Sequence, residues 1–259
     1  MFDYRMHNRI QQWMIEAAEK LRQSLKRDLE VEQKTSASDL VTEMDKKTEA
    51  YFVEKIRRYY PDSRILGEEG SGDVIEDVSG TLWIIDPIDG TLNFVKQKNH
   101  FAIMIGIFQD GEPMAGYIYD VMNYNLYYGI VGDGVYVNQK PLIPNEITTL
   151  DNEMIVGNTN NFIYNRLNAR ALSEHCLGVR TYGSAAIEII SVLNGEVALY
   201  FSTRLNPWDF GAGYAIFETL GYKVTNHKGE PLNILKKSPV LFAHPNVYDD
   251  AIKLLNQTK

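Results

Sequence analysis

Two aspartates stand in the stretch Trp83-Ile84-Ile85-Asp86-Pro87-Ile88-Asp89-Gly90-Thr91-Leu92-Asn93-Phe94, directly after an apolar run. The apolar run predicts a strand that delivers Asp86 at its exposed end, and Pro87 turns the chain so that Asp89 can point to the same side. Gly90 permits a close approach to the backbone. A short helix is expected to begin at Thr91, where free N–H groups and the positive end of the helix dipole would favour a phosphate group.

Further carboxylates follow a predicted strand or begin a predicted helix elsewhere in the chain. Gly67-Glu68-Glu69-Gly70 places two of them at a turn, and Asp209 stands at a helix start. A single aspartate at a helix start is usually a cap, and Asp-Pro is usually a turn. Two aspartates followed by Gly-Thr nevertheless favour a metal site, because carboxylate and carbonyl oxygens are the ligands that Mg²⁺ prefers.

The composition is that of an ordinary folded protein, with 44% of the 259 residues apolar and 23% charged. The net charge of −8 argues against a protein that works on nucleic acid or an anionic membrane, although a bound metal can still attract a small anionic substrate. Cys176 is the only cysteine, so no internal disulfide can form. With no signal-peptide core and no apolar stretch near the ~20 residues that span a bilayer, the sequence predicts a cytoplasmic protein.

Periodicity predicts a mixed α/β protein. Amphipathic helices are expected over about residues 4–30 and 43–60, with a polar stretch at 34–39 between them and Pro61 at the end of the second. Strands are expected over 64–66, 82–85, 101–108, 114–119, 126–130, 135–137, 153–157, 197–201 and 222–225, and helices over 166–175, 184–193 and 208–220. This order predicts one domain with a metal-site lobe over about 1–145 and a substrate lobe over about 146–259.

Three separated motifs resemble the inositol monophosphatase family, which belongs to the lithium-sensitive, Mg²⁺-dependent phosphatases. They are Gly67-Glu68-Glu69, the stretch from Trp83 to Phe94, and Trp208-Asp209-Phe210-Gly211-Ala212-Gly213; Leu40-Val41-Thr42-Glu43-Met44-Asp45 also matches the family's pattern. The resemblance runs from about Lys34 to Gly221, with the motifs in the family's order. It implies a layered α-β-α-β-α sandwich of the inositol monophosphatase / fructose-1,6-bisphosphatase type, usually assembled as a homodimer.

The resemblance also implies a role for each residue of the site, with two to three Mg²⁺ ions bound. Glu68, Asp86 and the Ile88 carbonyl would hold the first ion, Asp86, Asp89 and Asp209 the second, and Glu68 would help to hold a weaker third. Thr91 and Asp45 would orient and deprotonate the attacking water, and Glu69 would orient water or support the ligands. Asp89 and the backbone of Gly90 and Thr91 would meet the phosphate, and no covalent intermediate is needed.

The stretch from Arg180 to Ala186 resembles the family's substrate loop, which places Gly183, Ser184 and Ala185 near the alcohol part of the substrate. Ser184 can also be a simple helix N-cap. Inositol-specific members carry a glutamate seven residues before the last metal-binding aspartate, but Ser202 stands there in this chain. Losing that hydrogen-bonding anchor should weaken discrimination for the inositol hydroxyls. Arg204, nearby, is either a surface side chain or a contact for a second phosphate.

Hydrolysis of inositol 1-phosphate to inositol and phosphate is the first functional hypothesis. The second keeps the chemistry but takes fructose 1,6-bisphosphate, NADP or adenosine 3′,5′-bisphosphate, and it depends on whether Arg204 faces the pocket. The third adds binding to the transcription machinery, as in some members of the family. The sequence singles out no surface for such a partner.

Overall fold

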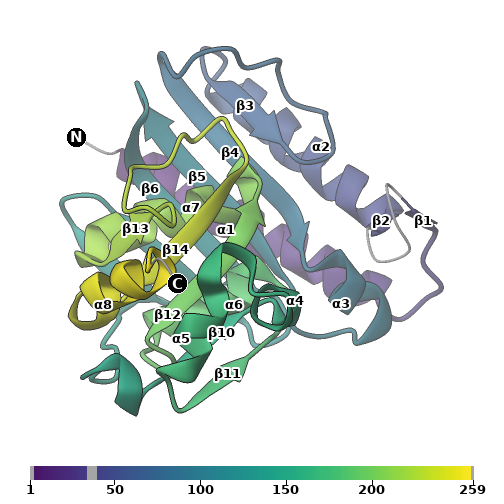
Figure 1. Cartoon of the computed structure of the whole chain (residues 1–259). Helices are drawn as coiled ribbons and strands as arrows, with labels where there is room; N and C mark the ends of the chain where they lie inside the picture. Colours follow the sequence, from purple (N-terminus) through teal and green to yellow (C-terminus); the bar gives the residue numbers. More distant parts are fainter. Residues whose placement is uncertain (1–2, 34–39, 258–259) are drawn as a thin grey trace.

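The computed structural model describes residues 3–33 and 40–257 (Figure 1). Two helices, α1 (Tyr4–Ser24) and α2 (Glu43–Tyr59), and a pair of short antiparallel strands, β1 (Val31–Gln33) and β2 (Leu40–Thr42), form the N-terminal part. The polar stretch predicted over 34–39 lies outside the described residues. In this described part of the chain, no helix is both long and apolar enough to cross a bilayer.

A seven-stranded sheet follows, in the order β3-β4-β5-β6-β7-β8-β9. The edge strand β3 runs parallel to β4, and every other neighbouring pair is antiparallel. The strands are β3 (Arg64–Gly67), β4 (Thr81–Asp89), β5 (Ala102–Gln109), β6 (Glu112–Asp120), β7 (Asn125–Ile130), β8 (Gly134–Val137) and β9 (Lys140–Pro141). The short helix α3 (Thr91–Lys96) begins at Thr91, as the sequence predicts.

The second half of the chain builds a five-stranded sheet in the order β11-β10-β12-β14-β13. Its strands are β10 (Met154–Gly157), β11 (Gly178–Arg180), β12 (Leu199–Leu205), β13 (Lys223–Thr225) and β14 (Ser238–Ala243). Its helices are α4 (Thr159–Ile163), α5 (Ala169–Glu174), α6 (Ala185–Leu193), α7 (Pro207–Leu220) and α8 (Pro245–Leu255), with 3₁₀ turns at Leu150–Asn152 and Arg166–Asn168.

Strand alternation divides the buried side chains into layers. Trp83 and Ile85 of β4 face α1 and α2, whereas Leu82 and Ile84 of the same strand face α6 and α7. The second sheet covers the other side of α6 and α7, and its far face packs on α5 and α8. The layers are therefore α-β-α-β-α, as the family resemblance implies, with α1 and α2 on one outer side in Figure 1 and α8 on the other.

Helix α7 lies very close to the large sheet because glycines face it. A Cβ atom at Gly106 would lie 2.7 Å from the Gly211 carbonyl carbon, and one at Gly116 would lie 2.1 Å from the Ala212 carbonyl oxygen. Helix α7 packs on both sheets and so joins the halves of the molecule through one core. The division into two lobes near residue 145 stays a prediction.

Several predicted boundaries are wrong. The first helix ends at Ser24 instead of continuing to residue 30, and the helix predicted over 166–175 begins only at Ala169, because Leu167 and Asn168 have positive φ angles of 48° and 60°. Strand β12 begins at Leu199 and runs on to Leu205, beyond the predicted 197–201. Strand β14 and helix α8 have no counterpart in the prediction.

Candidate active site

Strand β4 delivers Asp86 and Asp89 to the same end of the large sheet. The strand continues past the predicted end at Ile85, and its pairing with β5 shifts between Asp86 and Asp89. Pro87 cannot donate to the sheet ladder, so an irregularity at this point is expected. The Ile88 N–H donates instead to Asp86 Oδ1 at 3.1 Å. Both carboxylates are nearly buried, with Asp86 1% and Asp89 7% exposed.

Asp89 also joins the two halves of the molecule. Its carboxylate accepts hydrogen bonds from the Ser184 hydroxyl and from the backbone N–H groups of Ala185 (3.2 Å) and Ala186 (2.8 Å). These groups form the start of α6, so Asp89 supplies a negative charge at the positive end of that helix. These hydrogen bonds hold the end of β4 next to the start of α6, although the two segments are about a hundred residues apart in the sequence.

Asp209 completes a cluster of three carboxylates. It lies in the first turn of α7, where its Oδ2 accepts the Asn206 N–H at 2.7 Å. One oxygen from each of Asp86, Asp89 and Asp209 lies within 4.8 Å of the others. Glu68 and Ile88 line the same cavity of about 340 Å³, together with Leu40, Gly90, Thr91, Leu92, Asn158 and Gly183. We call this space the acidic cavity.

Burial and mutual repulsion raise the pKa values of the clustered carboxyls. Burial has the largest effect on Asp86, and Glu68, Asp89 and Asp209 raise its pKa further. Burial and then the charge of Asp89 raise the pKa of Asp209 to about 8. Among the described residues that line the acidic cavity, none is Lys or Arg. A buried group of carboxylates that raise one another's pKa values fits a divalent metal ion, and an all-oxygen donor set suits Mg²⁺.

Thr91 lines the acidic cavity, and Asp45 lies beside Thr91, outside the cavity lining. Thr91 Oγ1 is 2.9 Å from Asp45 Oδ1 and 3.0 Å from the Ile88 carbonyl oxygen. Asp45 is fully buried at the start of α2, and its other carboxylate oxygen accepts the Thr42 N–H (2.7 Å) and hydroxyl (2.6 Å). Burial raises the pKa of Asp45 even though these hydrogen bonds oppose the shift. The pair therefore places a hydroxyl backed by a carboxylate beside the carboxylate cluster.

The residues predicted for the alcohol side divide into two groups. Gly183 lines the acidic cavity, whereas Ser184 and Ala185 are buried and engage Asp89. Ser202 is buried, its hydroxyl accepts the Arg204 N–H at 3.4 Å, and Arg204 is exposed. Neither Ser202 nor Arg204 lines the cavity. The structure therefore gives no support to a second phosphate bound by Arg204.

Two buried glutamates that support the site are absent from the prediction. Glu49 of α2 accepts the backbone N–H groups of Glu69 and Ser71, both at 2.7 Å, and so holds the loop that carries Glu68. Glu188 of α6 accepts the N–H groups of Tyr182 (3.1 Å) and Gly183 (3.3 Å). In the sequence both look like ordinary helical surface charges. The only available signal is their position on the apolar side of their helices.

Comparison with known proteins identifies the family of the chain. The sequence profile of the inositol monophosphatase family matches residues 5–259. An inositol-1-monophosphatase of Bacillus subtilis is 40% identical over 240 residues, which cover 91% of each chain. The chain belongs to the inositol monophosphatase family. As a member of that family it is a phosphoric monoester hydrolase.

Two further relatives have names that include other phosphate substrates. A fructose-1,6-bisphosphatase/inositol-1-monophosphatase of Thermotoga maritima is 32% identical over 228 residues, with 88% of this chain and 86% of the relative covered. A crystal structure of an IMPase/NADP phosphatase with Mg²⁺ and phosphate has a TM-score of 0.90 at 28% identity, and the match covers 98% of this chain and 96% of the other. The family fold is therefore shared by proteins named for different phosphate esters.

Proposed function

We propose that this protein hydrolyses a small phosphate monoester, with inositol 1-phosphate as the first candidate, and uses Mg²⁺ held in the acidic cavity. The observation that carries the proposal is the convergence of Asp86, Asp89 and Asp209, with oxygens within 4.8 Å of one another in a cavity that also meets Glu68. The name of the B. subtilis relative and the Mg²⁺ bound in the IMPase/NADP phosphatase structure support it.

Glu68, Asp86, Asp89, Asp209 and the Ile88 carbonyl would hold two to three Mg²⁺ ions. Bound there, Mg²⁺ supplies charge neutralisation for the phosphate dianion and Lewis-acid activation of water. The clustered carboxylates have raised pKa values and must lose their protons before they can serve as ligands, so their metal affinity rises with pH.

Thr91 and Asp45 are proposed to handle the proton of the attacking water. When Thr91 donates its single hydroxyl proton to Asp45 Oδ1, its oxygen lone pairs can accept a hydrogen bond from a water in the cavity. The proton of that water can then pass by way of Thr91 to the carboxylate of Asp45. Glu69 is proposed to orient water or to support the metal ligands. Glu49 holds its backbone in place by accepting the Glu69 N–H.

The phosphate and its alcohol are proposed to lie between α3 and the loop before α6. Helix α3 begins at Thr91. The N–H groups at the start of a helix have no acceptor within that helix, so the backbone N–H groups of Gly90 and Thr91 can donate to phosphate oxygens. Gly183 faces the same cavity and would border the alcohol. With Ser202 buried outside the cavity, we expect a weaker preference among alcohols than a glutamate contact would give.

A substrate panel tests the proposal. Phosphate release would be measured with saturating Mg²⁺ from inositol 1-phosphate, fructose 1,6-bisphosphate, NADP and adenosine 3′,5′-bisphosphate. We expect the highest kcat/KM for inositol 1-phosphate, and no gain from a second phosphate because Arg204 stands outside the cavity. A clear preference for a bisphosphate would contradict the substrate assignment, and folded, Mg²⁺-loaded protein that turns over none of them would contradict the function.

A homodimer, a cytoplasmic location and binding to the transcription machinery stay predictions.

A further inference from the structure

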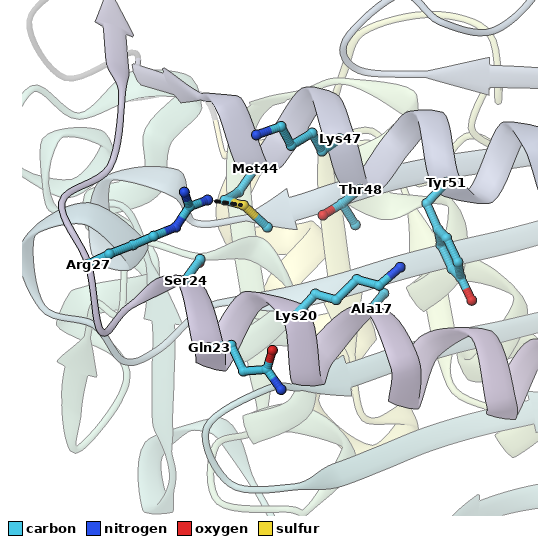
Figure 2. Close-up of a pocket in the computed structure, with 9 residues that line it drawn as sticks. All are labelled: Ala17, Lys20, Gln23, Ser24, Arg27, Met44, Lys47, Thr48 and Tyr51. Atoms are coloured by element: carbon cyan, nitrogen blue, oxygen red, sulfur yellow. Dashed lines mark hydrogen bonds between the residues drawn. The ribbon is translucent and has the colours of Figure 1, made fainter.

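A second cavity lies between helices α1 and α2, away from the acidic cavity. Its volume is about 530 Å³, within the range of small-molecule sites. Figure 2 shows the nine residues that line it, and none of them also lines the acidic cavity. We call this cavity the α1–α2 groove.

The floor of the groove contains a threonine hydroxyl that is open to a ligand. Ala17, Ser24, Met44 and Thr48 form this floor and are all at most 6% exposed. The Ser24 hydroxyl donates to the Leu21 carbonyl at 2.7 Å. The Thr48 hydroxyl, on a side chain only 4% exposed, makes no hydrogen bond within the described part of the chain and faces the groove in Figure 2. The Thr48 oxygen is open to the groove, so water or a ligand oxygen can bond to it.

The rim of the groove is basic, although the chain as a whole carries a net charge of −8. Lys20, Arg27 and Lys47 line it, and no described lining residue is Asp or Glu. Arg27 and Lys47 both pair with the single carboxylate of Glu43, the former at 3.0 Å. The Lys20 ammonium lies 4.1 Å from the centre of the Tyr51 ring. Glu16 is a second carboxylate, close enough to Lys20 for the lysine charge to lower its pKa, so three cations face two carboxylates and one positive charge remains.

Helical spacing explains why these groups meet. Lys20, Ser24 and Arg27 repeat every three or four residues along α1, and Met44, Thr48 and Tyr51 do so along α2, so each set lies on one helix face. Asp45 and Glu49 occupy the adjacent face of α2, which serves the active site. A molecule in the groove would therefore contact the helix that positions Asp45.

We propose that the α1–α2 groove binds a small organic phosphate dianion. Its phosphate would lie among Lys20, Arg27, Lys47 and the Thr48 hydroxyl, and its non-ionic part against Met44 and the Tyr51 ring. A phosphate fits better than a single carboxylate because it brings two charges and three acceptor oxygens to three cations and a hydroxyl. The groove is separate from the phosphatase centre, so this proposal does not depend on the proposed function.

Phenyl phosphate is the probe, titrated calorimetrically at low salt into full-length protein that has been stripped of metal with EDTA. Without metal, the acidic cavity is a group of carboxylates that disfavours an anion, so binding reports on the groove, and no turnover is expected. We expect saturable binding, weakened about threefold or more by Lys20→Gln and by Thr48→Val. Phenol, which lacks the phosphate, should not bind.

Lys55→Gln is the matched control, because Lys55 also lies near the Tyr51 ring, at 5.3 Å, but does not line the groove. It should leave the affinity unchanged. Lys20 is exposed, so its variant is expected to fold even if Thr48→Val does not. The proposal would be overturned by wild-type protein that shows no saturable binding below about 10 mM. Equal affinity in the wild type and the Lys20→Gln variant would also overturn it.

Discussion

At the scale of single residues, two carboxylates of the site, Asp89 and Asp45, each combine a structural contact with a proposed chemical role. Asp89 is a candidate metal ligand and also holds the start of α6. Asp45 accepts hydrogen bonds from Thr42 at the start of α2 and also lies 2.9 Å from the Thr91 hydroxyl. Substitutions at these positions would therefore mix structural and chemical effects. Thr91 and Glu188 offer cleaner tests, since each has a substitution that keeps its shape.

Thr91→Val should lower kcat by about a hundredfold or more, because it removes the hydroxyl that links water to Asp45 and keeps the side-chain volume. Thr91→Ser retains the hydroxyl and should keep most of the activity. Steady-state phosphate release at saturating Mg²⁺ measures both. Valine and serine variants with equal kcat would contradict the proposed role of the hydroxyl.

Glu188→Ala should raise KM about fivefold or more, because it leaves the N–H groups of Tyr182 and Gly183 without their shared acceptor and loosens the loop beside the cavity. Glu188→Gln still offers an amide oxygen and should restore KM to near the wild-type value. Burial raises the pKa of Glu188 to about 7, so the neutral glutamine is a reasonable mimic at neutral pH. An unchanged KM in the alanine variant would rule out this positioning role.

At the scale of elements, the contact between α7 and the large sheet fixes Asp209 relative to β4. The glycines of β5 and β6 let the helix approach until backbone atoms nearly touch. Because α7 begins two residues before Asp209 and β4 ends at Asp89, the distance between these two carboxylates depends on this packing.

Gly116→Ala should lower the free energy of unfolding by about 2 kcal/mol or more, because the new Cβ would lie 2.1 Å from the Ala212 carbonyl oxygen and the helix must shift. Chemical denaturation of the metal-free protein measures the change. Gly178→Ala is the control, since its Cβ would meet only the end of the Arg180 side chain at 3.4 Å. Equal stability of the two variants would show that the contact between α7 and the large sheet tolerates a wider spacing.

The sequence predicts the elements near the motifs better than the remaining ones. The apolar run before Asp86 and the glycine after Leu220 mark β4 and the end of α7, and the structure contains both. Strand β14 and α8 follow no motif, and the turn at Leu167 and Asn168 needs a positive φ angle at Leu167, which leucine rarely adopts. The contacts from Glu49 to Ser71 and from Asp89 to Ser184 link distant positions, and local spacing carries no information about them.

At the scale of the whole molecule, the raised carboxyl pKa values make the stability of the metal-free protein depend on pH. The pKa of Asp209 is about 8 in the folded protein and near the ordinary aspartate value of 3.8 in the unfolded chain. Between these values the folded state binds more protons than the unfolded state, so stability falls as pH rises. The raised pKa of Asp86 acts in the same direction.

We therefore expect the Tm of the metal-free protein to fall between about pH 5 and pH 8. Saturating Mg²⁺ should remove or reverse this trend, because the ion binds the deprotonated carboxylates of the folded state only. Thermal unfolding with EDTA and with Mg²⁺ across this range gives the comparison. A metal-free Tm that rises with pH throughout would show that the cluster is not destabilising in the absence of metal.

The most direct test of the central claim is phosphate release from inositol 1-phosphate as a function of Mg²⁺ concentration, for the wild type and Asp86→Asn. Asp62→Asn is the control, since Asp62 is an exposed acid away from the acidic cavity. We predict Mg²⁺-dependent release by the wild type and the control, and a loss of about a hundredfold or more in folded Asp86→Asn protein. Release that needs no divalent metal, or that survives in Asp86→Asn, would contradict a metal-dependent phosphatase centred on these carboxylates.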